Sequence, residues 1–319
     1  MTTFFCSSSV GVVALRGADT IDLLQRLSTK DLRPLHNAPG VLSTLFVTRQ
    51  GKMRDWVRVI AREDDVLLQT SEPERAAGLV EWIRDFTIME DVVAEDASDA
   101  WRGLLVHGSE AWRALGDAPP GASGLVVSGR AVGIRGIAAY GQRAQWLLPR
   151  EEIREAEARC TDAGCVAADP AAWDVWRVAA GIPGPKTEFP REVNPLELRL
   201  TDEAISWNKG CYVGQEVISR MDSYNKIARV LMGFELSSQS LPAGLDLGAM
   251  RVQQRDQIIG GVTSLVEKPG GGAIGLAIIK RKAAIPGSAE LVVDAQKMSI
   301  ALVDRPFWES QTEAFLSPS

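Results

Sequence analysis

The chain carries, at residues 209–216, the octapeptide Lys-Gly-Cys-Tyr-Val-Gly-Gln-Glu. Cys211 stands between two glycines and two residues after Lys209, and a helix-like run follows the octapeptide. A thiol just before a helix faces unpaired backbone N–H groups and the positive end of the helix dipole, and a neighbouring ammonium also favours the thiolate. We therefore expect Cys211 to attack electrophiles or to bind metal. The alternative is a buried structural cysteine in a turn, the common fate of a free cysteine.

The residues on either side of the octapeptide differ in character. Residues 182–200 contain four prolines, which exclude a long helix or a central strand and indicate a linker or a functional loop. After residue 226, short β-like runs recur between Gly and Pro turns, at 228–236, 251–253, 257–266, 273–280 and 290–302. Several short strands at this spacing predict a small barrel or sandwich.

The first ninety residues predict helices and strands in mixed order. Two strand-like runs, 41–47 and 53–60, are joined by a loop in which Gly51 takes the positive-φ position of a hairpin. Apolar residues at helical spacing predict amphipathic helices over residues 20–27 and 74–86. A second α/β unit of similar size follows.

These patterns predict an α+β protein in three parts. Residues 1–225 are expected to form an α/β region of two modules, with a boundary somewhere between residues 90 and 150. Residues 226–306 are expected to form the C-terminal β-barrel and residues 307–319 a tail.

Composition narrows the class of protein. Of the 319 residues, 45% are hydrophobic and 24% are charged, as in ordinary folded domains. No apolar run approaches the roughly 18 residues that span a bilayer, and the net charge of −6 argues against a surface coated for nucleic acid. Four cysteines without an export signal indicate reduced thiols in the cytoplasm.

The histidines and the acidic residues of the sequence do not predict a metal site. The chain has only two histidines, so a histidine-based site has little material. Residues 85–99 hold six acidic residues and no basic one, without the spacing of a calcium loop. We interpret this acidic stretch as a solvated boundary.

The octapeptide is also the signature of the YgfZ branch of the folate-binding superfamily that includes the glycine-cleavage aminomethyltransferase (GcvT-like). All the fixed residues of that signature are present. The resemblance extends over residues 10 to 305, and further segments that resemble the family lie at 27–32, 48–55, 177–183 and 194–197.

The resemblance implies an architecture and a function. Two α/β modules and a C-terminal β-barrel would surround a central hole that binds folate. The implied function is that of a tetrahydrofolate-binding accessory factor in iron–sulfur cluster assembly or repair. The implied partners are iron–sulfur client enzymes or assembly proteins, among them enzymes that thiolate tRNA, which makes the link to tRNA indirect.

The family cysteine matches Cys211, whose role would be that of a transient cluster ligand or of a thiol that bonds reversibly to another thiol or sulfur carrier. Lys209 would hold the thiolate or an anionic ligand group, and Tyr212 is placed with the folate-binding residues. Trp207 could stack on the pterin. Arg220 could pair with a folate carboxylate, and the alternative for it is an ordinary surface ion pair.

Two acidic positions are matched from the aminomethyltransferases. Glu197 matches the glutamate that contacts the pterin, a group that a carboxylate can bind through paired hydrogen bonds. Asp55 matches one of two adjacent aspartates near the folate nitrogen, and the second position holds Trp56. This departure favours the accessory factor over the alternative, a folate-dependent one-carbon transferase. A third possibility is a module that uses folate only structurally, so the sequence leaves open whether the chain is an enzyme.

Overall fold

The computed structural model describes residues 3–108, 112–113, 125–128, 130–135, 143–236, 246–268, 271–293 and 296–304. The chain divides into two units. Unit 1 contains Met1–Ala168 and Leu200–Val217, and unit 2 contains Asp169–Arg199 and Ile218–Ser319. The expected boundary between residues 225 and 226 stays a prediction.

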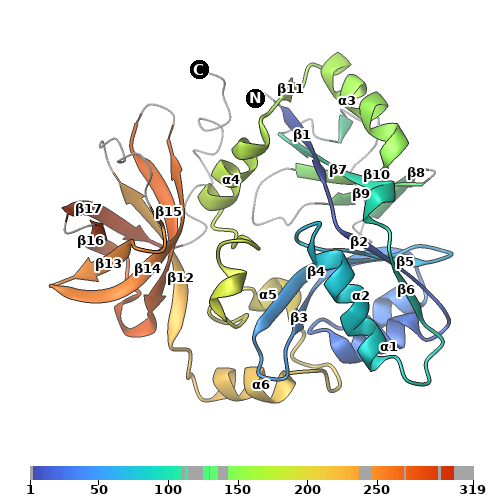
Figure 1. The fold of residues 1–319 in the computed structure, drawn as a ribbon, viewed down its shortest axis with the longest axis horizontal. Coiled ribbons are helices and arrows are strands. Elements are labelled where there is room, and N and C mark those ends of the chain that lie inside the picture. Colours follow the sequence, from blue (N-terminus) through green and yellow to red (C-terminus); the bar gives the residue numbers. More distant parts are fainter. Residues whose placement is uncertain are drawn as a thin grey trace. The chain divides into compact units, whose positions relative to one another are not determined.

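A five-stranded sheet in the order β3-β4-β5-β2-β6 forms one half of unit 1. Its strands are β2 (Val12–Arg16), β3 (Gly40–Val47), β4 (Met53–Ala61), β5 (Val66–Gln69) and β6 (Val93–Asp96). Helices α1 (Thr20–Leu27) and α2 (Arg75–Phe86) pack their apolar faces on it around a buried cluster that includes Leu24, Phe46 and Ile83 (Figure 1). Both helices confirm the sequence-based prediction.

The predicted hairpin is present between β3 and β4. The two strands pair from Gly40 opposite Ala61 to Val47 opposite Met53. In the loop, the Gly51 N–H donates to the Thr48 carbonyl at 2.8 Å, and Gly51 has φ +70°. Only glycine adopts that conformation without strain, so Gly51 sets the turn.

The other half of unit 1 is a six-stranded sheet in the order β11-β1-β7-β10-β9-β8. Its strands are β1 (Phe4–Ser9), β7 (Trp101–His107), β8 (Leu125–Ser128), β9 (Ala131–Arg135), β10 (Arg143–Pro149) and β11 (Val166–Ala167). Helix α3 (Ile153–Asp162) packs on this sheet through Ala156 and Cys160. A separate apolar cluster that includes Val12, Ile60 and Leu147 joins the two sheets.

Unit 2 contains a closed barrel of six antiparallel strands in the order β12-β15-β14-β13-β16-β17, drawn in orange and red in Figure 1. The strands are β12 (Arg229–Leu236), β13 (Arg251–Gln254), β14 (Gln257–Glu267), β15 (Ala273–Lys280), β16 (Gly287–Val293) and β17 (Gln296–Val303). The predicted run 290–302 was wrong as a single strand, because β16 and β17 divide it and pair with each other. Closure leaves no long free edge, which explains why short strands suffice.

The remaining elements are short. Helix α4 (Pro170–Ala179) belongs to unit 2 and α5 (Thr201–Ala204) to unit 1, and α6 (Gln215–Ser223) begins at the last two residues of the octapeptide. Among the described residues, the 3-10 turns are η1 (Arg33–His36), η2 (Ser98–Ala100), η5 (Arg150–Glu152), η6 (Phe189–Arg191) and η7 (Arg281–Ala283). Among the residues that the structure describes, no helix is long and apolar enough to cross a membrane. The mixed α/β modules and the C-terminal barrel confirm the predicted fold class.

Candidate functional site

The first six residues of the octapeptide lie in a loop of unit 1 that connects α5 with α6, and its last two residues begin α6. The loop is bound to the segment after α1. The Thr29 hydroxyl donates to the Ala204 carbonyl at 2.5 Å, and the Ser206 N–H donates to the Thr29 carbonyl at 3.0 Å. The Asp31 N–H donates to the Ser206 hydroxyl at 3.1 Å. The segment 27–32, which the family resemblance singled out, is therefore hydrogen-bonded to the residues just before the octapeptide.

Lys209 fastens the octapeptide to the end of α1. Its Nζ donates to three backbone carbonyls, those of Gln25 at 2.7 Å, Ser28 at 2.6 Å and Lys30 at 2.8 Å. Carbonyls at a helix C-terminus lack partners within the helix and attract a cation, so the ammonium fits this position. Burial lowers the pKa of Lys209 to about 8. An ammonium has three donors and all three are used here, so the expected pairing of Lys209 with the thiolate is not what the structure shows.

Tyr212 and Gly214 complete the attachment of the loop. The Tyr212 ring is buried, with its centroid 5.3 Å from the Lys209 ammonium, and burial raises the pKa of its hydroxyl to about 12. Gly214 has φ +81°, and a Cβ there would lie 2.5 Å from the Thr48 carbonyl oxygen. Only glycine can occupy this position, because the loop lies directly against the β3–β4 hairpin.

Cys211 is exposed between these fixed neighbours. Helix α6 begins at Gln215, which confirms the helix expected after the cysteine, and three residues separate Cys211 from it. Exposure excludes the alternative of a buried structural cysteine. Trp207, in the same loop, has 44% of its surface exposed. The loop therefore presents a thiol and an indole to solvent while its lysine and tyrosine are buried.

Asp55 is buried in β4 of unit 1, where it faces the residues after β5. Its carboxylate accepts hydrogen bonds from the Ser71 hydroxyl and from the N–H of Trp56 at 2.9 Å. Burial raises the pKa of Asp55 from 3.8 to about 6, and the hydrogen bond from Ser71 opposes the rise. The neighbouring Trp56 donates its indole N–H to the Ser43 hydroxyl at 2.6 Å. Asp55 is thus a shielded carboxyl that changes charge near neutral pH.

We expect the ionisation of Asp55 to make folding pH-dependent. Because the folded protein binds this proton more tightly than the unfolded chain does, stability should fall as the pH rises from about 4 to about 6. A pKa difference of about two corresponds to a loss on the order of 3 kcal/mol. Urea unfolding of the wild type and of Asp55→Asn across this pH range measures the loss of stability, because the variant lacks the titrating group. Parallel curves for the two proteins would contradict the prediction.

In unit 2, Glu197 is held in a tight ion pair. Its buried carboxylate accepts from Arg229 Nε at 2.9 Å and Nη2 at 3.1 Å, and from the Asn194 N–H at 3.2 Å. Arg229, the first residue of β12, has 38% of its side chain exposed. Arg229 was not among the predicted site residues, and its only signal in the sequence was its place at the start of a predicted strand.

The predicted site residues therefore fall into separate groups. Lys209, Cys211, Tyr212 and Trp207 share one loop of unit 1, and Asp55 lies on a strand of the same unit. Glu197 and Arg220 belong to unit 2, and Arg220 is exposed in the last turn of α6.

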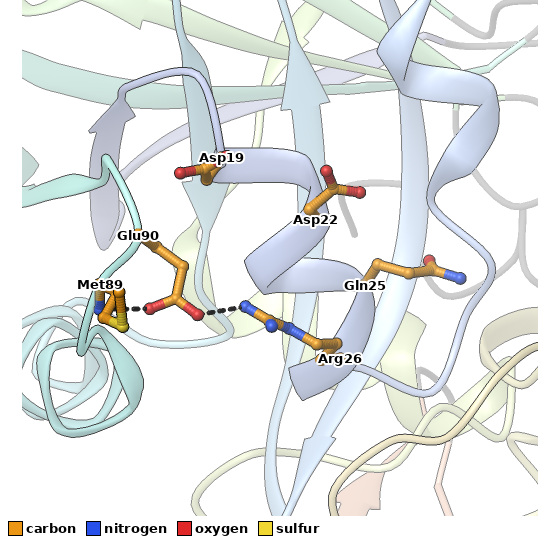
Figure 2. A pocket seen from close by; sticks show the side chains of 6 residues that line it. All are labelled: Asp19, Asp22, Gln25, Arg26, Met89 and Glu90. Atoms are coloured by element: carbon orange, nitrogen blue, oxygen red, sulfur yellow. Dashed lines mark hydrogen bonds and ion pairs between the residues drawn. The ribbon is translucent and has the colours of Figure 1, made fainter.

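A hollow of about 430 Å³ lies on the surface of unit 1 beside α1 (Figure 2). Its lining contains none of the predicted site residues and consists of Asp19, Asp22, Gln25, Arg26, Met89 and Glu90. Gln25 and Arg26 also bind the octapeptide loop through their carbonyls, to Lys209 Nζ and to the Val213 N–H.

Comparison with known proteins defines the class of this fold. The structure aligns with the glycine cleavage system aminomethyltransferase T from Bartonella henselae with a TM-score of 0.78, over 97% of this chain and 87% of that one, at 17% identity. The described elements therefore form an aminomethyltransferase fold.

The amino-acid sequence is also similar to those of named proteins. The chain is 27% identical to the aminomethyltransferase of Rubrobacter xylanophilus, over 95% of this chain and 82% of that protein. It is also 27% identical to the mitochondrial homolog of the iron-sulfur cluster assembly factor IBA57 from Mycosarcoma maydis, over 74% of this chain and 58% of that protein. No family model matches the chain. The aminomethyltransferase fold and the similarity to both relatives agree with the resemblance to the GcvT-like superfamily.

Proposed function

We propose that the protein is a tetrahydrofolate-binding accessory factor in iron–sulfur cluster assembly or repair, with Cys211 as its working thiol. The observation that carries the proposal is the exposed Cys211 in a loop whose flanking residues are fixed by Lys209 and Tyr212. A rigid loop presents a thiol to a partner at little entropic cost. The relative named as an iron-sulfur cluster assembly factor supports the same function.

The described residues supply donors and acceptors that fit a folate. A carboxylate has about four acceptor positions, and Glu197 uses three of them, so one remains for an N–H of a pterin. Arg229 pairs with this carboxylate and leaves part of its own guanidinium exposed. Tetrahydrofolate would supply a carrier for one-carbon groups. Arg220, Asp55, Trp207 and Tyr212 stay predicted folate contacts, and the central hole stays a prediction.

The iron–sulfur cluster would be cargo that this protein shares with a partner. Iron–sulfur clusters are held by about four thiolates or comparable ligands. Within the described ranges, no three His, Cys, Asp or Glu side chains lie together in a group that could hold a metal ion. Cys211 would therefore contribute one ligand while the client enzyme or assembly protein contributes the others. In the alternative role, the Cys211 thiolate attacks a sulfur of the partner's disulfide, and the partner's other thiolate leaves as the new S–S bond forms.

Cys211→Ser tests the proposal. The variant should lose essentially all support of cluster enzymes in cells that lack the wild-type protein, because serine is a poor ligand for iron and cannot exchange with disulfides. Its melting temperature should match that of the wild type, since the side chain is exposed. Tetrahydrofolate should raise the melting temperature of both proteins through ligand linkage.

A matched control replaces the exposed Ser223 at the end of α6 with alanine and should retain full support. Full support by Cys211→Ser would remove the thiol from the function. The absence of any thermal shift with tetrahydrofolate would remove the cofactor.

The second candidate function is folate-dependent one-carbon transfer. Asp55 favours it, because a shielded carboxyl with its pKa raised to about 6 can exchange a proton near neutral pH. The relative named aminomethyltransferase covers most of the chain. Trp56 at the second acidic position weighs against it. Production of methylene-tetrahydrofolate from a protein-bound aminomethyl donor, lost in Asp55→Asn, would establish this function in place of the first.

The cytoplasmic location and the indirect link to tRNA thiolation also belong to the proposal. A working thiol requires a reducing compartment, which the cytoplasm provides. The IBA57 homolog is named as mitochondrial, so cell fractionation decides the location.

A further inference from the structure

Two large apolar side chains stand in water at the turn between α2 and β6. Ile88 and Met89 expose 86% and 93% of their surface. They lie within the acidic stretch 85–99, which the proposed function does not use. Large apolar side chains held side by side in solvent mark an interaction surface more often than isolated ones do.

The turn is held in place by its own acidic residue. Glu90 Oε2 accepts from the N–H groups of Ile88 at 2.9 Å and Met89 at 3.1 Å, and Glu90 Oε1 accepts from Arg26 Nη2 at 2.6 Å. These hydrogen bonds, with those of the backbone first and Arg26 next, lower the pKa of Glu90 to about 2. The carboxylate therefore stays charged at neutral pH, and the turn stays folded with both apolar side chains outward.

A second set of bonds ties the same turn to the start of α1. The Asp91 N–H donates to Asp19 Oδ2 at 2.8 Å, and the Ala18 N–H donates to Asp91 Oδ2 at 3.1 Å. The apolar pair is thus fixed against α1 at two points. A surface fixed before binding loses little conformational entropy when a partner docks.

The hollow shown in Figure 2 lies between this turn and α1, and its charge is unbalanced. Three carboxylates, those of Asp19, Asp22 and Glu90, line it with one cation, Arg26, which Glu90 already neutralises. Asp22 is exposed and contacts His36 at 3.1 Å, a partner that is charged only when protonated. Excess negative charge beside exposed apolar side chains specifies a complementary occupant, with a cation next to an apolar group.

We propose that the hollow and the turn at Ile88 and Met89 together form a docking surface for a basic segment of a partner protein. A Lys or Arg side chain of the partner would enter the hollow between Asp19 and Asp22. An adjacent apolar side chain would pack on Met89 and Ile88. A second copy of this chain fits poorly, because a symmetric contact would bring two acidic surfaces together.

This inference goes beyond the proposed function and stands independently of Cys211, since the two surfaces share no side chain. A partner that docks here could be a client of the thiol or an unrelated protein, and the chemistry of recognition is the same.

The test uses a fluorescent amphipathic peptide of lysine and leucine as the probe, with the full chain, at about 0.15 M salt, where distant charges are screened. A matched peptide carries glutamate in place of lysine. Fluorescence anisotropy should show that the basic peptide binds the protein and that the acidic peptide does not. Met89→Ser and Asp22→Asn should each weaken that binding about tenfold, since each removes one half of the recognition.

Two control variants replace comparable exposed residues elsewhere, namely Ile285→Ser, at an isoleucine with 66% exposure, and Asp162→Asn, at an exposed aspartate. Both should bind the peptide as the wild type does. Equal weakening in the controls, or equal binding of the acidic peptide, would overturn the proposal. Self-association in sedimentation that disappears in Met89→Ser would overturn it in favour of a second copy. Circular dichroism spectra of the variants should match that of the wild type, because the substituted side chains are exposed.

Discussion

Lys209→Met should destabilise unit 1 by about 3 kcal/mol, since a hydrogen bond to a charged group contributes about 1.5–3 kcal/mol. Three such bonds disappear together, and the carbonyls of Gln25, Ser28 and Lys30 lose their partner. The expected loss is smaller than the sum, because burying the ammonium already costs free energy, as its lowered pKa shows. Methionine keeps the length and the apolar character of the lysine side chain, so the change in stability measures the loss of the charged ammonium group.

Hydrogen exchange of unit 1 amides measures this change, because it resolves local stability where a single unfolding curve would mix the two units. The control is Lys226→Met, at an exposed lysine that contacts the Tyr224 ring, and it should change stability by less than about 0.5 kcal/mol. Protection in Lys209→Met equal to that of the control would show that the ammonium holds nothing. If the Cys211 loop takes part in the function, Lys209→Met should also weaken the support of cluster enzymes. A lysine that only paired with the thiolate would leave hydrogen exchange near Thr29 unchanged.

Arg177→Met should destabilise unit 2 by about 3–5 kcal/mol, the usual cost of removing one partner of a buried ion pair. Arg177 is buried in α4, and its Nη1 donates to the Ile182 carbonyl at 3.0 Å and contacts Glu188 Oε2 at 3.4 Å. Its Nη2 donates to the Ser264 hydroxyl of β14 at 3.1 Å. The substitution would leave the fully buried Glu188 without its cation, and the link between α4 and the barrel would be lost.

Hydrogen exchange of the amides in unit 2 measures the loss of stability. Two further variants test whether the buried ion pair causes it. Asp174→Asn changes the exposed partner of the same arginine, at 3.0 Å, and should alter stability by less than about 1 kcal/mol. Arg177→Met combined with Glu188→Gln should be less damaging than the sum of the single variants, because no buried charge is then left unpaired. Additive losses would show that the two charges are not coupled.

Much of the fold was predictable from short stretches of chain. Helices α1 and α2 and the β3–β4 hairpin follow from helical spacing, strand-like runs and the turn at Gly51, all of which act between near neighbours. The barrel followed from short runs between Gly and Pro turns, although the division between β16 and β17 did not, because both strands are apolar at alternate positions. The first strand, β1, joins the six-stranded sheet while the next strand, β2, joins the other, and no local pattern signals that exchange.

The candidate site was predictable in its position but not in its chemistry. The octapeptide located the thiol, and exposure of Cys211 agrees with a working role. The partners of Lys209 lie 184, 181 and 179 positions away in the chain, so spacing carried no information about them. For the same reason the partner of Glu197 was missed, since Arg229 is 32 positions further along.

The amino-acid sequence by itself determined which segments are helix or strand, where the glycine turns lie and which cysteine follows the signature lysine, because these depend on backbone preferences and apolar spacing. Only the tertiary structure decided which of the charged residues are buried, and therefore that Lys209 binds carbonyls, that Glu197 binds Arg229 and that Asp55 titrates near pH 6. Desolvation and hydrogen bonding act between atoms that meet only when distant segments fold together.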